Sequence, residues 1–322
     1  MKIGFVLICY NQKKFIRESL EGIRLQTEEP DEVIISDDCS KDGTQQEILD
    51  YIDEFELGEK WKVILHKENQ GINKNLQNAI DLCSTDIILG NAGDDISLPN
   101  RVQVARKLAE KYPDLYVITT SIDKIDENGN RIGEITYNDI LDEDIKKVVL
   151  SGMPHIFPVG QFWRKSLFTD YGPLPINVPN EDDQITFRAI LHGGIFCSKE
   201  KTMLYRIHQD STSSWLRNRQ SEQEFFRRFI SDMTIRINHM ELWKDSVSKS
   251  NFKEKKEVLA ILEKKISLYN IFRDIETVPI NQRIASLFKF WNFTVTREKV
   301  YLFFGSFGVL LWRRMKIALG KI

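Results

Sequence analysis

Residues 87–101 read IILGNAGDDISLPNR and are the most informative stretch of the chain. A run of three apolar residues (87–89) is followed by small residues and then by two adjacent carboxylates, Asp94 and Asp95. Leu98-Pro99 then opens a helix. A buried strand that ends in acids is typical of an open α/β sheet, which binds ligands at the carboxyl ends of its strands. Adjacent carboxylates repel unless a cation lies beside them, and their hard oxygens suit Mg²⁺ or Mn²⁺. The alternative is an acidic turn that only caps the next helix.

Apolar runs alternate with helical patterns through the first 125 residues. Strands are predicted at residues 3–8, 32–36, 61–66, 86–90 and 116–121, and helices at 15–26, 44–55, 72–83 and 99–112. This alternation predicts βαβ units with right-handed crossovers and a mostly parallel sheet flanked by helices. Because parallel strands end at one edge of a sheet, Asp37 and Asp38, which follow the second strand, are expected to line one cleft with Asp94 and Asp95.

The pattern is less regular after residue 121. We expect a hairpin turn at 126–130, an acidic helix or loop at 139–151, one firm element at 161–165, a helix at 184–192, and short strands at 195–198 and 202–207. Prolines and glycines interrupt residues 154–179, and we interpret this region as the wall of a binding site rather than as part of the core scaffold. From about residue 215 the chain is predicted to be helical, with helices at 222–244, 252–273 and 281–291.

The bulk properties indicate a soluble protein with two differently charged parts. The net charge of the 322 residues is −2, but residues 1–212 hold 24 Lys and Arg against 36 Asp and Glu, whereas residues 213–322 hold 21 against 11. The apolar start is too short for a signal peptide, and no run is long enough to span a bilayer. Four cysteines without metal-type spacing indicate reduced thiols in a cytoplasmic protein.

Six segments together resemble the inverting nucleotide-sugar glycosyltransferases of the GT-A type, in the large bacterial family 2. They are VLICYNQ (6–12) with LQT (25–27), VIISDDCSKDGT (33–44), NQGINKN (69–75), AGDDISLPNR (92–101), NEDDQITFRAILHGG (180–194) and YRIHQDSTS (205–213), in the family's order. The resemblance implies a GT-A catalytic domain over residues 1–214. Residues 215–322 would then form a basic helical region that binds a membrane or other copies of the chain.

The resemblance implies that Asp95 is the best ligand for Mn²⁺ or Mg²⁺ and that Asp94 binds the metal or the ribose. A metal held by carboxylates neutralises the diphosphate that leaves the sugar. The family's commonest pattern has an acid two residues before Asp94, where this chain has Ala92, so the exact ligand shell is open. A histidine at the place of His208 approaches the metal or the diphosphate in relatives; a structural or surface histidine is the alternative.

The resemblance also places the nucleotide. Asp37 and Asp38 would contact base and ribose, and backbone near Tyr10 and Asn11 would complete that pocket. A carboxylate that accepts the imide N–H of uracil or thymine favours a UDP- or dTDP-sugar. Lys74 would meet the diphosphate, with a solvated surface lysine as the alternative. For the two acids the alternative is an Asx-type turn.

Asp182 resembles the family's catalytic base, and Glu181 is the neighbouring candidate. In a single inverting displacement the acceptor hydroxyl must lose its proton as it attacks the anomeric carbon, and a carboxylate can take that proton. Asp183 is expected to be a helix cap or a spectator. Without the resemblance, three acids at a helix N-terminus would be assigned to the helix dipole. Trp163 is expected to stack on a sugar face or to belong to the core.

The tail, residues 291–322, has an apolar run at 300–312 flanked by basic residues. It resembles an amphipathic segment on an anionic leaflet; packing on the catalytic domain is the alternative. A membrane-surface location would suit an acceptor carried on a polyprenyl lipid, or another glycan acceptor, in bacterial surface polysaccharide synthesis. The protein would then be cytoplasmic and peripheral on the inner face of the plasma membrane, and its oligomeric state is open.

The sequence argues against three other functional classes. A nucleotidylyltransferase would carry a glycine-rich phosphate loop after the first strand, and CYNQKKF has no glycine. A catalytically degenerate scaffold that binds nucleotide sugars has only Ala92 in its favour. Nucleic-acid binding is not expected, because the basic residues of the tail alternate with apolar ones at helical spacing.

Overall fold

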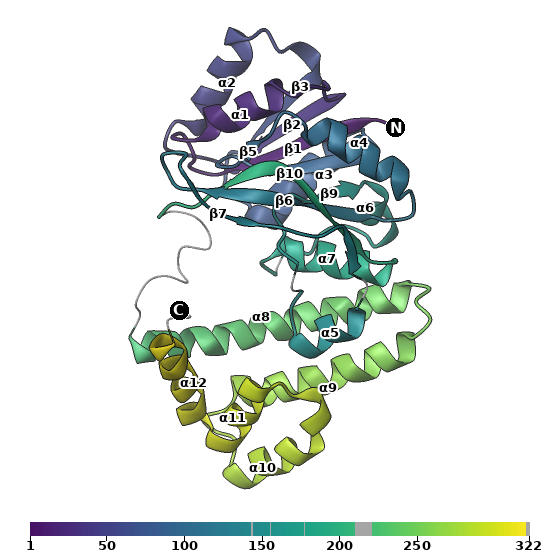
Figure 1. Ribbon diagram of the computed structural model, residues 1–322. Helices are drawn as coiled ribbons and strands as arrows, with labels where there is room; N and C mark the ends of the chain where they lie inside the picture. The colour runs from purple at the N-terminus through teal and green to yellow at the C-terminus, as the bar shows by residue number, and fades with distance from the viewer. Residues whose placement is uncertain (143, 155, 177, 210–220, 320–322) are drawn as a thin grey trace. The chain divides into compact units, whose positions relative to one another are not determined.

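The computed structural model describes residues 1–142, 144–154, 156–176, 178–209 and 221–319 (Figure 1). The chain forms two compact units: a sheet unit of residues 1–143 and 156–208, and a helical unit of residues 144–155 and 209–322. The predicted boundary between residues 214 and 215 lies outside the described residues, as do the last four residues of the YRIHQDSTS segment. Helix α5 (Ile145–Ser151) groups with the helical unit rather than with the sheet unit.

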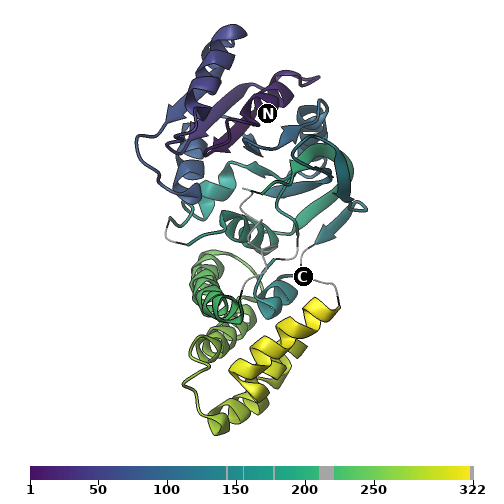
Figure 2. The same ribbon diagram turned by 90° about the vertical axis from the view of Figure 1, so that its left-hand side faces the viewer.

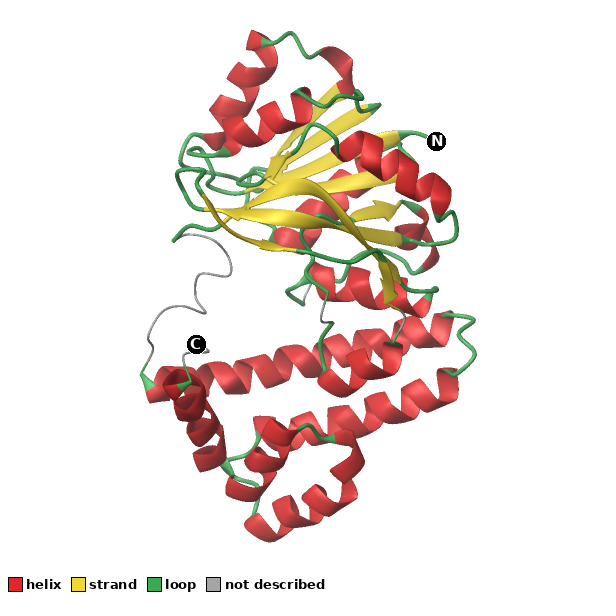
Figure 3. Cartoon of the chain, viewed as in Figure 1, coloured by secondary structure: helices red, strands yellow, loops and turns green. Residues whose placement is uncertain are grey.

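The sheet unit is an α/β structure (Figure 3). Its strands are β1 (Ile3–Cys9), β2 (Glu32–Asp37), β3 (Trp61–Leu65), β4 (Ile87–Ala92), β5 (Ile96–Ser97), β6 (Val117–Ile125), β7 (Arg131–Ile135), β8 (Ile140–Asp142), β9 (Phe162–Arg164) and β10 (Ile195–Arg206). Its helices are α1 (Ile16–Arg24), α2 (Thr44–Glu54), the 3-10 turn η1 (Gly58–Lys60), α3 (Ile72–Leu82), α4 (Arg101–Lys111), α6 (Ser166–Asp170) and α7 (Glu181–Leu191).

The strand order is β3-β2-β1-β4-β9-β6-β10-β5, with β7 beside β6 and β8 beside β10. The long pairings, β3 with β2, β2 with β1, β1 with β4 and β6 with β10, are parallel. The short strand β9 is antiparallel to both β4 and β6. The predicted mostly parallel α/β sheet is therefore confirmed.

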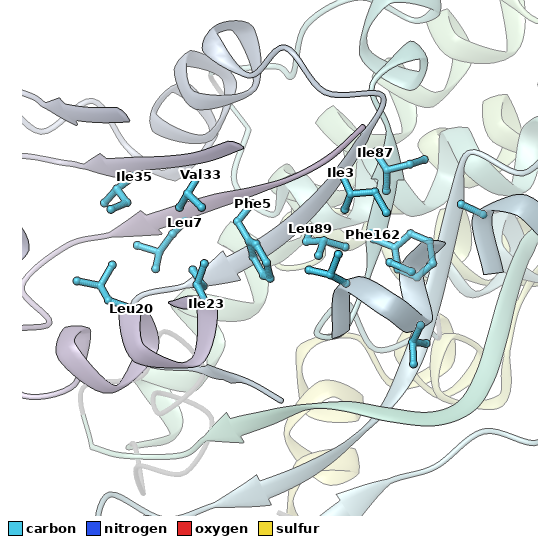
Figure 4. Close-up of a cluster of buried hydrophobic side chains, with 14 of the residues drawn as sticks. Ile3, Phe5, Leu7, Leu20, Ile23, Val33, Ile35, Ile87, Leu89 and Phe162 are labelled. Carbon is cyan, nitrogen blue, oxygen red and sulfur yellow. The ribbon is translucent and has the colours of Figure 1, made fainter. Parts of the chain in front are cut away.

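The core of the sheet unit explains why β1, β2 and β4 read as apolar runs. All six residues of β2 are buried, as expected for a parallel strand covered on both faces. The side chains of Phe5 and Leu7 point toward Leu20 and Ile23 of α1, and Phe162 of β9 extends the same cluster (Figure 4). This layer fixes the ends of β1 and β4, from which the site is built.

The structure corrects two of the predicted elements. The short strands expected at 195–198 and 202–207 are one strand, β10, whose register against β6 shifts between Ser198 and Met203. Such a bulge interrupts the period-2 pattern without ending the strand. The two-residue strand β5 was not predicted, because a pair that short has no periodicity; it is defined only by its pairing with β10.

The helical unit contains α5, α8 (Glu222–Lys249), α9 (Lys255–Arg273), α10 (Ile280–Lys289), the 3-10 turn η3 (Trp291–Phe293), α11 (Thr296–Phe304) and α12 (Ser306–Ala318). A buried ion pair joins α9 to α11, with the Lys265 Nζ 2.9 Å from the Glu298 carboxylate. Gly305 (φ 62°, ψ −142°) ends α11 and begins α12, so the apolar run at 300–312 is not one helix. In the part of the chain that the structure describes, every helix is too short or too polar to cross a bilayer.

Candidate active site

A cavity of about 170 Å³ lies in the sheet unit, where β1 and β4 end. Its wall includes Ile8 of β1, Asp95 after β4 and Trp163 of β9. The first turn of α7 adds Glu181 and Asp182. The fold therefore brings the acids of two separate sequence segments to one cavity.

Hydrogen bonds from β10 hold the turn that carries Asp94 and Asp95. The backbone N–H of Arg206 donates to the Asp95 Oδ1 over 2.9 Å, and the Arg206 Nε donates to the Asp94 carbonyl over 3.0 Å. The Arg206 side chain is buried and also pairs with Glu18 at 2.7 Å. The sequence alone predicts no role for Arg206, although Arg206 lies in the YRIHQ segment two residues before His208.

His208 lies beside Asp94. Its Nε2 is 3.0 Å from the Asp94 Oδ2, and its ring packs against that of Phe15 at 4.7 Å between centroids. The structure thus places two of the predicted metal-binding residues, His208 and Asp94, in contact, with the third, Asp95, next to Asp94 in the turn after β4.

The carboxylates at Asp95 and Asp94 fit a divalent cation whose coordination shell is completed by a bound ligand. Burial and the neighbouring Asp94 carboxylate raise the pKa of Asp95 well above its usual value, and a bound cation would relieve that repulsion. Within the described ranges, no group of three or more His, Cys, Asp or Glu side chains is placed so that it could hold a metal ion by itself. Mg²⁺ commonly takes one or two protein carboxylates and completes its shell with substrate phosphates, so Asp95 and Asp94 fit that mode.

Two acids in the first turn of α7 have shifted pKa values. Burial and the Asp182 carboxylate raise the pKa of Glu181 to about 7, and burial raises the pKa of Asp182. The Asp182 Oδ1 accepts the backbone N–H of Asp183 over 3.0 Å. Asp183 is not part of the cavity wall. A carboxylate whose pKa is near neutrality is suited to accept a proton at physiological pH.

Asp37 and Asp38 are buried and hold neighbouring loops. Asp38 accepts the backbone N–H groups of Gln70 and Gly71 over 2.7 and 2.9 Å. Asp37 accepts the backbone N–H of Ser40 over 2.8 Å, and its oxygens also accept the Ser40 hydroxyl and the Gln45 amide. The contact of Asp37 with Ser40 is local, as in the turn that was the alternative, whereas Asp38 holds a loop that is distant in the sequence. The nucleotide-binding role of both acids stays a prediction.

The other predicted nucleotide-binding residues lie outside the cavity wall. Asn11 has a left-handed backbone (φ 52°), and its Oδ1 accepts the backbone N–H of Lys41 over 2.8 Å. Tyr10 is exposed, and so is Lys74 in the first turn of α3. Because Asp38 binds the loop that leads into α3, the ends of β1 and β2 and the start of α3 form one connected surface beside the cavity.

Two further residues position the cavity wall. The Trp163 Nε1 donates to the Gln161 Oε1 over 3.1 Å, which fixes the indole against the cavity. The buried Arg101 donates to the Asn91 Oδ1 over 2.8 Å and to the Gly90 carbonyl over 2.6 Å, and burial lowers its pKa to about 9. Arg101 is the last residue of the 87–101 stretch, but nothing in its neighbouring residues predicts that its side chain hydrogen-bonds to β4.

Gly90→Ala is expected to destabilise the protein by about 1–3 kcal/mol, because a Cβ at residue 90 would overlap the indole of Trp163 and force it to move. Thermal unfolding of the variant measures this. Gly133→Ala on β7 is the control, since the nearest atom to its Cβ would be 3.9 Å away in ordinary contact. An unchanged melting temperature for Gly90→Ala would show that the indole is not held against β4.

Comparison with known proteins agrees with this architecture. The S. aureus TarS fragment 1–349 in complex with UDP-GlcNAc superposes with a TM-score of 0.62 at 17% identity, over 94% of this chain and 86% of that one. The mannosyltransferase PcManGT of Pyrobaculum calidifontis, in complex with GDP-Man and Mn²⁺, superposes with a TM-score of 0.55 at 14% identity, over 99% and 80%. At these identities the likeness shows the fold alone.

The family is established by sequence. The Mycobacterium tuberculosis protein Rv1520 is 27% identical over 211 residues, 64% of this chain, and the match spans 59% of Rv1520. The family described as Glycosyl transferase family 2 matches residues 5–172, which is more than half of the chain. With the GT-A-like sheet and the carboxylates at its edge, this match confirms the predicted resemblance: the chain belongs to glycosyl transferase family 2.

Proposed function

We propose that the protein moves a sugar from a nucleotide-diphospho sugar to a hydroxyl of a glycan or polyprenyl-linked acceptor, with inversion and with a divalent cation. The observation that carries this proposal is that Asp95, Glu181 and Asp182 line one cavity. A cation-binding carboxylate and a candidate base are the two groups that a single displacement at an anomeric carbon requires.

In the proposed reaction Asp182 accepts the proton of the acceptor hydroxyl, and Glu181 is the second member of the pair. Bond formation at the anomeric carbon and loss of the nucleoside diphosphate occur in one step on opposite faces of the sugar, which inverts its configuration. When bound, Mn²⁺ or Mg²⁺ held by Asp95 and Asp94 would neutralise the leaving diphosphate. His208 orients the Asp94 carboxylate through the 3.0 Å contact.

The donor is proposed to be a UDP- or dTDP-sugar. Its base would lie near Tyr10, Asn11, Asp37 and Asp38, and its diphosphate near Lys74. TarS is known in complex with UDP-GlcNAc and PcManGT in complex with GDP-Man and Mn²⁺, so proteins of this fold take nucleotide sugars of more than one base. An acceptor on a polyprenyl lipid, as in bacterial surface polysaccharide synthesis, would place the protein at the inner face of the plasma membrane.

A thermal-shift panel of UDP, dTDP, GDP, CMP and their common sugars, each with Mn²⁺, Mg²⁺ or EDTA, tests this function. A ligand that binds only the folded state stabilises it by about 2.7 kcal/mol at one hundred times its Kd, so a true donor raises the melting temperature. We expect a cation-dependent shift with uridine or thymidine donors, followed by release of the nucleoside diphosphate when acceptor is added. No shift with any member would contradict the proposal, and binding without turnover would favour the scaffold alternative.

A further inference from the structure

The last helices of the chain expose a connected group of aromatic side chains. Trp291 of η3, Phe303 and Phe304 of α11 and Phe307 of α12 are 51%, 52%, 47% and 56% exposed. The ring centroids of Phe303 and Phe304 are 4.8 Å apart, and those of Phe304 and Phe307 are 6.3 Å apart. We call these four residues the aromatic face. Single exposed apolar residues are common, but a contiguous group of aromatic rings usually marks a binding surface.

A lysine joins Trp291 to the other three rings. The Lys299 Nζ lies 3.9 Å above the Trp291 indole, and Lys299 is one helical turn before Phe303 on α11. Helix α11 packs against both α10 and α12 in the helical unit (Figures 1 and 2). The aromatic face is therefore a composite of three elements and differs from the single amphipathic segment expected at residues 300–312.

The opposite side of the same helices is the core of the helical unit. Tyr301, Leu302 and Val309 are buried, and the Tyr301 ring packs on those of Phe229 and Phe272. Gly305 has φ 62°, a conformation that a residue without a Cβ adopts easily. The chain turns there between α11 and α12, and Phe307 packs near Phe304. The fold thus separates buried apolar residues from a second, exposed set that the helical unit does not need for packing.

The charge of this segment is strongly one-sided. Residues 280–319 contain seven basic residues, namely Arg283, Lys289, Arg297, Lys299, Arg313, Arg314 and Lys316. Their one acidic residue, Glu298, is buried and paired with Lys265. The helices that carry the aromatic face therefore have cations and no exposed acid of their own; Lys299 lies against Trp291, and Arg314 pairs with Glu222 of α8 at 2.7 Å.

We propose that the aromatic face binds the surface of an anionic lipid bilayer, with its rings at the boundary between headgroups and acyl chains and its cations at the lipid phosphates. Trp and Phe form the inserted apolar face of helices that lie at this interfacial layer, and each Lys or Arg near an anionic surface strengthens binding about fivefold. A second copy of the chain is a poorer occupant, because two such faces would bring like charges together. The inference deepens the proposed function and rests on it, since it gives the route by which the enzyme reaches a lipid-borne acceptor.

Cosedimentation of the full chain with vesicles tests the proposal. We expect binding to phosphatidylcholine vesicles that contain phosphatidylglycerol, weakened by high salt, and little binding to pure phosphatidylcholine. The triple variant Phe303→Ser, Phe304→Ser, Phe307→Ser should bind about 100-fold more weakly, because three rings no longer leave water. All three positions are exposed, so the thermal unfolding of the variant should match that of the parent.

Matched controls distinguish this face from general stickiness. Ile132→Ser, Ile176→Ser and Leu82→Ser remove three exposed apolar side chains of the sheet unit and should leave vesicle binding unchanged. A second variant, Lys289→Gln with Lys299→Gln, removes two cations and should weaken binding about 25-fold at low salt. This double variant keeps the test decisive if the aromatic variant does not fold.

Several results would overturn the proposal. They are no sedimentation of the parent protein with anionic vesicles, equal binding to neutral vesicles, or equal loss of binding in the sheet-unit control. A parent that ignores vesicles but loses its oligomeric state in the triple variant would assign the face to contacts between copies instead. Vesicle binding requires no sugar donor, so the two proposals can be tested separately. A protein that shows the nucleotide-dependent thermal shift but does not bind vesicles would contradict the membrane proposal and still support the proposed function.

Discussion

Asp182→Asn is expected to lower the rate of sugar transfer by about 10²–10⁴-fold while the donor still binds. The change removes the carboxylate that would accept the acceptor proton, but it preserves the shape of the first turn of α7. Asparagine can also keep the hydrogen bond from the Asp183 backbone N–H. The measurement is the release of nucleoside diphosphate in the presence of acceptor, with donor binding followed separately by thermal shift.

Asp183→Asn is the matched control, because Asp183 is adjacent in sequence but does not line the cavity. Its transfer rate should stay within a few-fold of the parent. Glu181→Gln reports on the second candidate. If Asp182→Asn transferred sugar at the parental rate and Glu181→Gln did not, the base would be Glu181 and the assignment of Asp182 would be wrong.

The pH profile of the parent belongs to the same prediction. A carboxyl whose pKa is raised keeps its proton to higher pH, so the Glu181–Asp182 pair is partly protonated below about pH 7 and cannot serve fully as base. We expect the kcat/KM to rise about tenfold per pH unit up to about 7 and then to level off. Between the usual Glu pKa of about 4.3 and the raised pKa of about 7, the folded state binds more protons than the unfolded state. The contribution of this pair to the free energy of unfolding therefore falls as the pH rises from about 4.3 to about 7.

Asp95→Asn is expected to remove the dependence of donor binding on Mn²⁺ or Mg²⁺ and to lower transfer by about 10²–10⁴-fold, because the cation would lose its buried carboxylate ligand. The unliganded protein should nevertheless be as stable as the parent or more stable at neutral pH. Burial and Asp94 raise the pKa of Asp95, which means that its ionised form costs free energy in the empty site. Asparagine can retain the hydrogen bond from the Arg206 backbone N–H.

Thermal shifts with UDP-sugar and Mn²⁺ or EDTA separate these two effects. Asp50→Asn, an exposed carboxylate on α2, is the control and should behave as the parent. A cation-dependent shift of parental size in Asp95→Asn would show that the metal is held elsewhere. A large fall in the melting temperature without ligand would instead give Asp95 a structural role through Arg206.

Much of the sheet unit followed from the sequence because the signals there are local. The apolar runs of β1, β2 and β4 and the helical patterns between them repeat over a few residues, so the elements were predicted to within a few residues of their ends. The same locality failed at β10, where a bulge near Ser198 broke the pattern.

The sequence by itself determined the order of the long strands and helices of residues 1–125, the family, and which acids follow a strand or open a helix, because these depend on neighbouring residues. Only the tertiary structure decided what each acid can do. Asp95 and Asp182 line one cavity because β4 and α7 meet there, whereas Asp37 and Asp38 give their oxygens to backbone N–H groups of loops. Arg206 holds the Asp94–Asp95 turn through hydrogen bonds between residues more than 100 positions apart, and contacts of that range leave no periodic signal in the chain.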